Sequence, residues 1–329
     1  MEPLGYPEYL RETDELAHPR PDMPMWSENY LSGASFPASG AGVWLHQCRP
    51  QHDPRFWEEV FTFMLPDDRF LVAKGATLAR PGEAAAGPAL VYECVRPFAE
   101  WRKSFQGLAR LATGDELRAG PLRDAPHLAV DMHLTWTGSS PVFDMDMSEQ
   151  SWADVKAHYQ QHCHVAGVLE FGGERMELEG FGMRDHSWGP RDLARLGNHA
   201  WIYCAFPSGK QLMYFHHDEA GGSGALEHGH EVVDGAFALV VNAGPLPLPR
   251  EPGAWKAPYA LDLRLPDGTV RTLTAEIITG QPLSIANGSE IILGAAGPDA
   301  SHHLLECPTR FEWDGEVGCG ITEWTWRTR

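Results

Sequence analysis

The densest group of reactive side chains lies in residues 180–192, which read GFGMRDHSWGPRD. If this segment is an extended strand, alternate residues point to opposite faces, so Arg184, His186 and Trp188 share one face and Asp185 lies on the other. An imidazole beside an indole, with carboxylates close by, suits acid–base chemistry on an apolar substrate. A buried strand end held by a satisfied ion pair explains the same residues without any activity.

Aromatic and acidic side chains farther along the chain could complete such a site. Trp201, Tyr203 and Tyr214 could present π faces to a developing cation, although core packing accounts for each of them as well. Glu323 lies in an alternating segment near the end of the chain. If it points inward it needs a partner such as His186 or the substrate; if it points outward it is a surface charge.

Four histidines form a rival site. His216 and His217 are separated from His228 and His230 by a Gly- and Ser-rich stretch at 220–224. A hairpin turning there would bring imidazoles of its two strands together, and with a nearby glutamate they could bind Zn²⁺ or Fe²⁺. No HExxH or HxD spacing supports a metal site, and a solvated hairpin tip explains the same residues.

The elements that would position these groups are short strands joined by tight turns. Three such units are residues 61–72, 201–215 and 261–273, which turn at PDD, PSG and PDG. Turn residues between alternating apolar runs are typical of β-hairpins. Repeated hairpins with few helical intervals predict an all-β fold of antiparallel barrels or sandwiches.

One segment departs from this pattern and suggests a domain organisation. Residues 148–161 begin at an N-cap serine and carry apolar side chains at helical spacing. We predict that this short helix connects an N-terminal β domain, residues 26–147, to a C-terminal β domain, residues 162–329, which carries the 180–192 segment. Residues 1–25 are predicted to form an N-terminal arm.

Composition excludes several classes of protein. The net charge of −19 argues against nucleic acid or an anionic membrane as a partner. No apolar run approaches the length of a transmembrane helix, and the six cysteines contain no CxxC pair, which suits the cytoplasm. The chain has no GxSxG elbow, P-loop or GxGxxG after a strand. The oligomeric state, a homodimer included, stays open.

The 180–192 segment also resembles a known family. With the preceding ELEGFG strand, it is similar to the hydroxyneurosporene synthase (carotenoid 1,2-hydratase) superfamily, whose more distant relatives include kievitone hydratase and lipocalin-like Diels–Alderases. The nearest likeness is to an uncharacterised bacterial branch, which residues 27–30 and 306–311 also resemble. The resemblance implies two tandem lipocalin-like antiparallel β domains, a ligand cavity and no cofactor.

The resemblance also implies roles for individual residues. The superfamily is thought to use a His-x-Trp pair, matched here by His186 and Trp188, and a Tyr-x-Asp pair on a neighbouring strand. Tyr214 matches the tyrosine, but His216 stands where the superfamily has aspartate. This departure leaves the identity of the proton donor open.

We therefore expect a cofactor-independent lyase or isomerase that hydrates, dehydrates or cyclises a hydrophobic, isoprenoid-like small molecule. In this hypothesis the catalytic groups are His186, Asp185, Tyr214 and His216, and the substrate contacts are Trp188, Arg184, Trp201, Tyr203 and Glu323. Two alternatives remain: a lipocalin-like carrier of a hydrophobic molecule, and a metal-dependent enzyme at the histidine hairpin.

Overall fold

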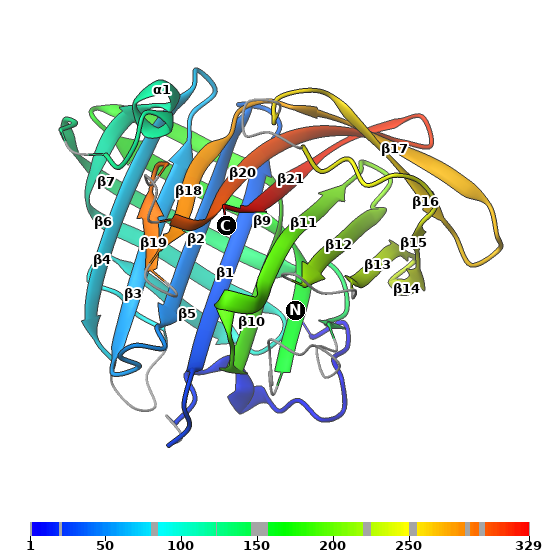
Figure 1. The fold of residues 1–329 in the computed structure, drawn as a ribbon, viewed down its shortest axis with the longest axis horizontal. Helices are drawn as coiled ribbons and strands as arrows, with labels where there is room; N and C mark the ends of the chain where they lie inside the picture. The colour runs from blue at the N-terminus through cyan, green and yellow to red at the C-terminus, as the bar shows by residue number, and fades with distance from the viewer. Residues whose placement is uncertain are drawn as a thin grey trace.

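Two antiparallel β-sheets account for nearly all the regular structure (Figure 1). This computed structural model describes residues 2–19, 22–79, 85–122, 124–145, 157–219, 225–249, 255–286, 290–295 and 300–328. Within them, the helices are η1 Glu12–Glu15, α1 Gly114–Arg118 and η2 Leu193–Arg195, and none is long and apolar enough to cross a bilayer. The all-β prediction is confirmed.

The strands divide between the sheets in chain order. The first sheet contains β1 Trp26–Phe36, β2 Ala41–Arg49, β3 Phe56–Met64, β4 Arg69–Leu78, β5 Leu90–Arg96, β6 Glu100–Thr113, β7 His127–Gly138, β8 Phe143–Asp144, β9 Ala157–Phe171 and β10 Glu174–Pro190. The second contains β11 Leu196–Ala205, β12 Gln211–Glu219, β13 Ala225–Val233, β14 Ala236–Leu239, β15 Val241–Asn242, β16 Tyr259–Arg264, β17 Val270–Ile277, β18 Gln281–Ala286, β19 Glu290–Leu293, β20 Ala300–Trp313 and β21 Glu316–Arg327.

The first sheet closes into an eight-stranded barrel. Its order is β10-β1-β2-β3-β4-β6-β7-β9, and the circle closes because β10 pairs with both β1 and β9. Large side chains such as Phe61, Phe105 and Trp136 fill its interior. The barrel therefore has a packed core of its own.

The second sheet lies across the outside of the barrel. β20 and β21 pass in front of β1 and β2 in Figure 1. Trp44 of the barrel packs against Leu283 and Leu304, and Met183 packs against Trp201. Because both of its faces are covered, β2 is buried along its whole length, whereas β5 has exposed residues interspersed with buried ones.

The predicted hairpins are confirmed more fully than the predicted helix. The three predicted hairpins are present as the pairs β3–β4, β11–β12 and β16–β17. The predicted helix 148–161 lies mostly outside the described residues, but its last residues, 157–161, begin β9 and are therefore strand. Tyr159 points into the barrel there, with its hydroxyl 3.0 Å from His186 Nδ1.

The 180–192 segment also belongs to a different part of the fold from the C-terminal domain in which it is predicted. The prediction puts it in a C-terminal domain of residues 162–329, whereas β10 pairs along its length with β1 and β9 of the first sheet. The first sheet ends at Pro190 and the second begins at Leu196. Hairpin signals show where the chain turns, but they do not show which sheet a strand joins.

Close contact between the sheets at Gly33 gives a first prediction. A Cβ added to this residue on β1 would overlap the Tyr203 hydroxyl of β11. We expect Gly33→Ala to lower the free energy of unfolding by about 1–3 kcal/mol, the usual cost of overpacking, in urea titrations. Among the described residues the Tyr203 hydroxyl has no hydrogen-bond partner, so a second substitution, Tyr203→Phe, should recover part of the loss. Equal losses with and without it would contradict the proposed clash.

Candidate active site

The motif strand β10 presents two chemically different faces. Arg184, His186 and Trp188 point into the barrel, where His186 stacks on Tyr30 with ring centroids 3.8 Å apart. Asp185 points outward, toward the second sheet, and lines a cavity there. The predicted alternation is confirmed, and it separates Asp185 from His186.

Arg184 is buried inside the barrel as part of an ion pair. Its Nη1 lies 3.1 Å from Glu15 Oε1, and its Nη2 donates to Gln161 Oε1 at 2.8 Å. The guanidinium also lies 3.4 Å from the ring centroid of Trp101. Glu15 belongs to η1, so this pair fixes the N-terminal arm to the barrel.

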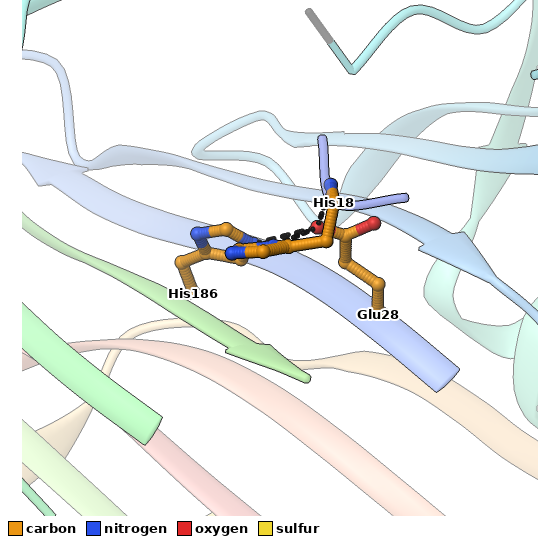
Figure 2. A group of neighbouring side chains, drawn as sticks. All are labelled: His18, Glu28 and His186. Atoms are coloured by element: carbon orange, nitrogen blue, oxygen red, sulfur yellow. Dashed lines mark hydrogen bonds and ion pairs between the residues drawn. The ribbon is translucent and has the colours of Figure 1, made fainter. Parts of the chain in front are cut away.

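His186 lies beside this pair in a second buried network. Its Nε2 is 3.2 Å from Glu28 Oε1, and its Nδ1 is 3.0 Å from the Tyr159 hydroxyl. His18 of the arm reaches the same oxygen of Glu28 from its Nδ1 at 2.7 Å, and Figure 2 shows the three side chains converging. Burial raises the pKa of Glu28, but the hydrogen bonds from His18 and His186 outweigh it and lower the pKa to about 2. His186 has no exposed surface and does not line the cavity.

Lys103 is a further charged group inside the barrel. Its ammonium hydrogen-bonds Ser32 and lies 4.4 Å from the ring centroid of Tyr92 and 4.3 Å from that of Trp136. Burial lowers its pKa from 10.5 to about 7. The barrel interior therefore disfavours the charged form of this lysine.

This shift predicts that Lys103→Met stabilises the protein at neutral pH. The pKa of Lys103 is about 7 when folded and near 10.5 when unfolded, so unfolding takes up a proton between these values and wild-type stability falls as the pH is lowered through them. Methionine has no such cost and fills a similar volume. The stability gain, measured by urea unfolding, should be small near pH 10.5 and reach a plateau below pH 7. A gain that is constant over this range would contradict the assignment.

A cavity of about 190 Å³ lies between the barrel and the second sheet. β1, β2, β9 and β10 form one wall, and β11, β12 and β18–β21 form the other. Its lining is largely apolar and includes Leu31, Trp44, Trp201, Phe215, Ile285 and Leu304. An apolar cavity of about 150 Å³ is enough to hold benzene, so this one can hold a small hydrophobic group.

A histidine paired with a carboxylate lies on each wall of this cavity. On the barrel wall, His158 Nε2 is 3.0 Å from Asp185 Oδ2, and Asp185 Oδ1 accepts the Leu31 backbone N–H at 3.1 Å. On the opposite wall, His199 Nε2 hydrogen-bonds Glu323 Oε1. In both pairs the carboxylate contacts Nε2, which leaves Nδ1 of each neutral imidazole as the basic nitrogen.

The His199–Glu323 pair on the second sheet has further polar neighbours. Thr325 Oγ1 lies 3.2 Å from His199 Nε2, and Glu306 is directly opposite Glu323 on the paired strand. Burial and the neighbouring Glu323 raise the pKa of Glu306 well above its usual value, and the two carboxyl groups are hydrogen-bonded to each other. His199 Nδ1 is buried without a hydrogen-bond partner among the described residues.

His46 adds a neutral imidazole to the barrel wall. Burial lowers its pKa to about 4, although the nearby carboxylates of Asp185 and Glu323 act in the opposite direction. At neutral pH it can therefore donate or accept a hydrogen bond without adding charge. The cavity combines apolar walls with several imidazoles.

The structure brings together some of the predicted site residues and separates others. Asp185, Trp201 and Glu323 line the cavity. Tyr203 packs beside it against Met183, between the sheets. Arg184 and His186 are buried inside the barrel. Trp188 is partly buried and stacks on His18 of the N-terminal arm. Tyr214 lies in the core of the second sheet, on the opposite face of β12 from the cavity residue Phe215. His216 is on the same face of β12 as Tyr214 and pairs with Asp218 at 2.9 Å.

The alternative metal site at the histidine hairpin does not appear as a ligand cluster among the described residues. β12 and β13 do make the predicted hairpin, but His216 is bound to Asp218 and His230 Nε2 lies 3.1 Å from His162 Nε2. The strand register places His217, His228 and His230 on one face of the sheet and His216 on the other. Within the described residues, the group of three or more potential metal ligands is instead His18, Glu28 and His186.

Sequence reasoning misses both histidines that pair with cavity carboxylates. His158 falls in the segment assigned to a helix, where the strand alternation that would place it near Asp185 is not considered. His199 precedes Trp201 by two residues, so strand alternation puts the two on one face. That spacing is a signal from which His199 could be found.

Comparisons with known proteins agree with this architecture. A family model described as a domain of unknown function, DUF7064, matches residues 11–328. A search of curated proteins finds no match. Among solved structures, a Nitrosomonas europaea protein provisionally named AttH is 16% identical, with 93% of this chain and 94% of that chain covered and a TM-score of 0.57.

Two further solved structures share the fold. CghA, in a crystal structure with Sch210972, is 12% identical with coverages of 92% and 89% and a TM-score of 0.54. Kievitone hydratase from Nectria haematococca is 9% identical with coverages of 91% and 88% and a TM-score of 0.54. The likeness establishes the lipocalin-like fold across most of the chain. Because the family model spans nearly all of its residues, this protein belongs to the DUF7064 family.

Proposed function

We propose that this protein is a cofactor-independent lyase or isomerase that acts by acid–base chemistry on a hydrophobic, isoprenoid-like small molecule. The observation that carries the proposal is the pair of histidine–carboxylate dyads, His158–Asp185 and His199–Glu323, on opposite walls of one apolar cavity. The fold shared with kievitone hydratase agrees with an enzyme of this class.

Two dyads facing one cavity suit a reaction that moves a proton from one position of the substrate to another. One neutral imidazole can accept a proton from a C–H or O–H group, while a protonated imidazole on the other wall donates one to an alkene carbon or a leaving hydroxyl. Each carboxylate orients its imidazole and stabilises the charge that forms on it. Hydration, dehydration and cyclisations that pass through a carbocation all use such a pair of transfers.

The apolar lining would contribute by excluding water and contacting a cationic intermediate. Trp44 and Trp201 both border the cavity, and indole faces attract a nearby cation. In a site of low polarity, the charges of the dyads act more strongly on the substrate than they would in water. These walls also fit a hydrocarbon better than a sugar or a nucleotide.

Deuterium exchange tests the proposal whichever hydrophobic molecule is the substrate. Ligands that co-purify with the protein are identified by mass spectrometry, and these ligands and a series of prenyl alcohols are incubated with the enzyme in deuterated water. We expect deuterium at carbon, or gain or loss of one water. His158→Gln should lose this activity and His164→Gln should keep it, because His164 lies on the same strand but pairs outside the cavity with Glu179. Ligands returned without deuterium or chemical change would overturn the proposal and indicate a carrier.

A further inference from the structure

We propose that His18, Glu28 and His186 form a binding site for a divalent transition metal ion, represented by Zn²⁺, at the end of the barrel. The site is separate from the cavity and does not enter the proposed reaction. Its three side chains come from the N-terminal arm, β1 and β10, and point toward one another in Figure 2. One ligand atom from each lies within 4.8 Å of the other two.

The donor set and its spacing suit zinc. Two imidazoles and one carboxylate are a common protein ligand set for this ion, with bond lengths of about 2.0–2.2 Å. Ligand atoms on a tetrahedral ion of that size lie about 3.3 Å apart. His186 Nε2 and Glu28 Oε1 are 3.2 Å apart, and His18 Nδ1 lies 2.7 Å from the same oxygen. Small side-chain rotations would admit the ion.

The hydrogen bond made by His186 Nδ1 also favours a cation at Nε2 of the same ring. The Tyr159 hydroxyl donates its single hydrogen to Glu15 Oε1 at 2.6 Å, so it accepts from His186 Nδ1–H at 3.0 Å. In the neutral ring this leaves a lone pair on Nε2, directed at a carboxylate oxygen of Glu28. Two acceptors facing each other require a cation between them, which is either a proton on His186 or a metal ion.

The surroundings resemble those of a built metal site. Tyr159 fixes the ring of His186, and Arg49 Nη1 lies 3.4 Å from the second oxygen of Glu28. Outer partners of this kind hold metal ligands in place. The side chains of Glu28 and His186 are fully buried, whereas His18 is 17% exposed, so an ion would enter beside the arm. Bound there, it would link the arm to the barrel.

Titration of the metal-free full chain, purified without a histidine tag, tests this inference. We expect Zn²⁺ to bind at one equivalent, and an excess to raise the thermal midpoint by about 5 °C. His18→Gln should weaken binding at least about 10-fold, and His133→Gln, an exposed histidine elsewhere in the barrel, should not. Co²⁺ bound at this site should give visible absorption bands that are absent from the His18 variant.

Two results would overturn the inference. One is Zn²⁺ binding well below one equivalent, which would leave a proton as the cation between His186 and Glu28. The other is full affinity in the His18→Gln variant, shown by circular dichroism to be folded. Either result leaves the proposed enzymatic function untouched, because that function is tested at His158 and Glu323, which are not ligands of this site.

Discussion

Glu323→Gln is expected to lower turnover by about 10²- to 10⁴-fold, the usual contribution of general acid–base catalysis. Glutamine can still accept a hydrogen bond from His199 Nε2, so the ring keeps its position. It carries no charge, however, and cannot stabilise the imidazolium that forms when His199 takes up a proton. The turnover number and the ligand dissociation constant should be measured separately, because binding is expected to change by less than about 3-fold.

A matched control lies on the same strand. Glu316 begins β21, carries a partly exposed side chain and pairs with Lys210 at 3.4 Å, away from the cavity. Glu316→Gln should therefore leave turnover unchanged. Asp185→Asn on the opposite wall should resemble Glu323→Gln, since each substitution removes the charge from one dyad. Wild-type turnover in the Glu323 variant would exclude the His199 dyad from catalysis.

Glu15→Ala is expected to lower the free energy of unfolding by about 3–5 kcal/mol, the cost of removing one partner from a buried ion pair. Arg184 would remain in the barrel with Gln161 and Trp101 but without a counter-charge. The same substitution removes the acceptor of the Phe98 backbone N–H and the nearer of two acceptors of the Tyr159 hydroxyl, the other being the Asp14 carbonyl oxygen. Urea unfolding at neutral pH measures the loss.

The exposed pair between Arg175 and Glu170 provides the comparison for Glu15. Both of its side chains are about half exposed, so Glu170→Ala should cost less than about 1 kcal/mol. A loss from Glu15→Ala as small as this would show that water reaches Arg184. It would also show that the arm contributes little to the stability of the barrel.

Local features of this fold could be predicted because their causes are local. Turn residues such as Pro66, Asp67 and Gly268 mark the ends of strands, and apolar alternation identifies the strands beside them. The same alternation assigns Asp185 and His186 to opposite faces of their strand. None of these signals depends on contacts between distant parts of the chain.

Contacts between distant segments decide which strands pair and what each face of the motif contacts. Asp185 and His186 are adjacent in sequence, but Asp185 faces the cavity and His186 faces the barrel interior. These surroundings arise because β10 pairs with β1, which lies more than a hundred residues earlier, and because the second sheet covers only the outer face of β10. Glu323 meets His199 through the pairing of β11 with β21, which are also far apart in the chain. The sequence by itself determined the strands and turns of three hairpins and the two faces of the motif. Only the tertiary structure decided what each face meets, because alternation orders side chains about one strand and carries no information about which strand lies opposite.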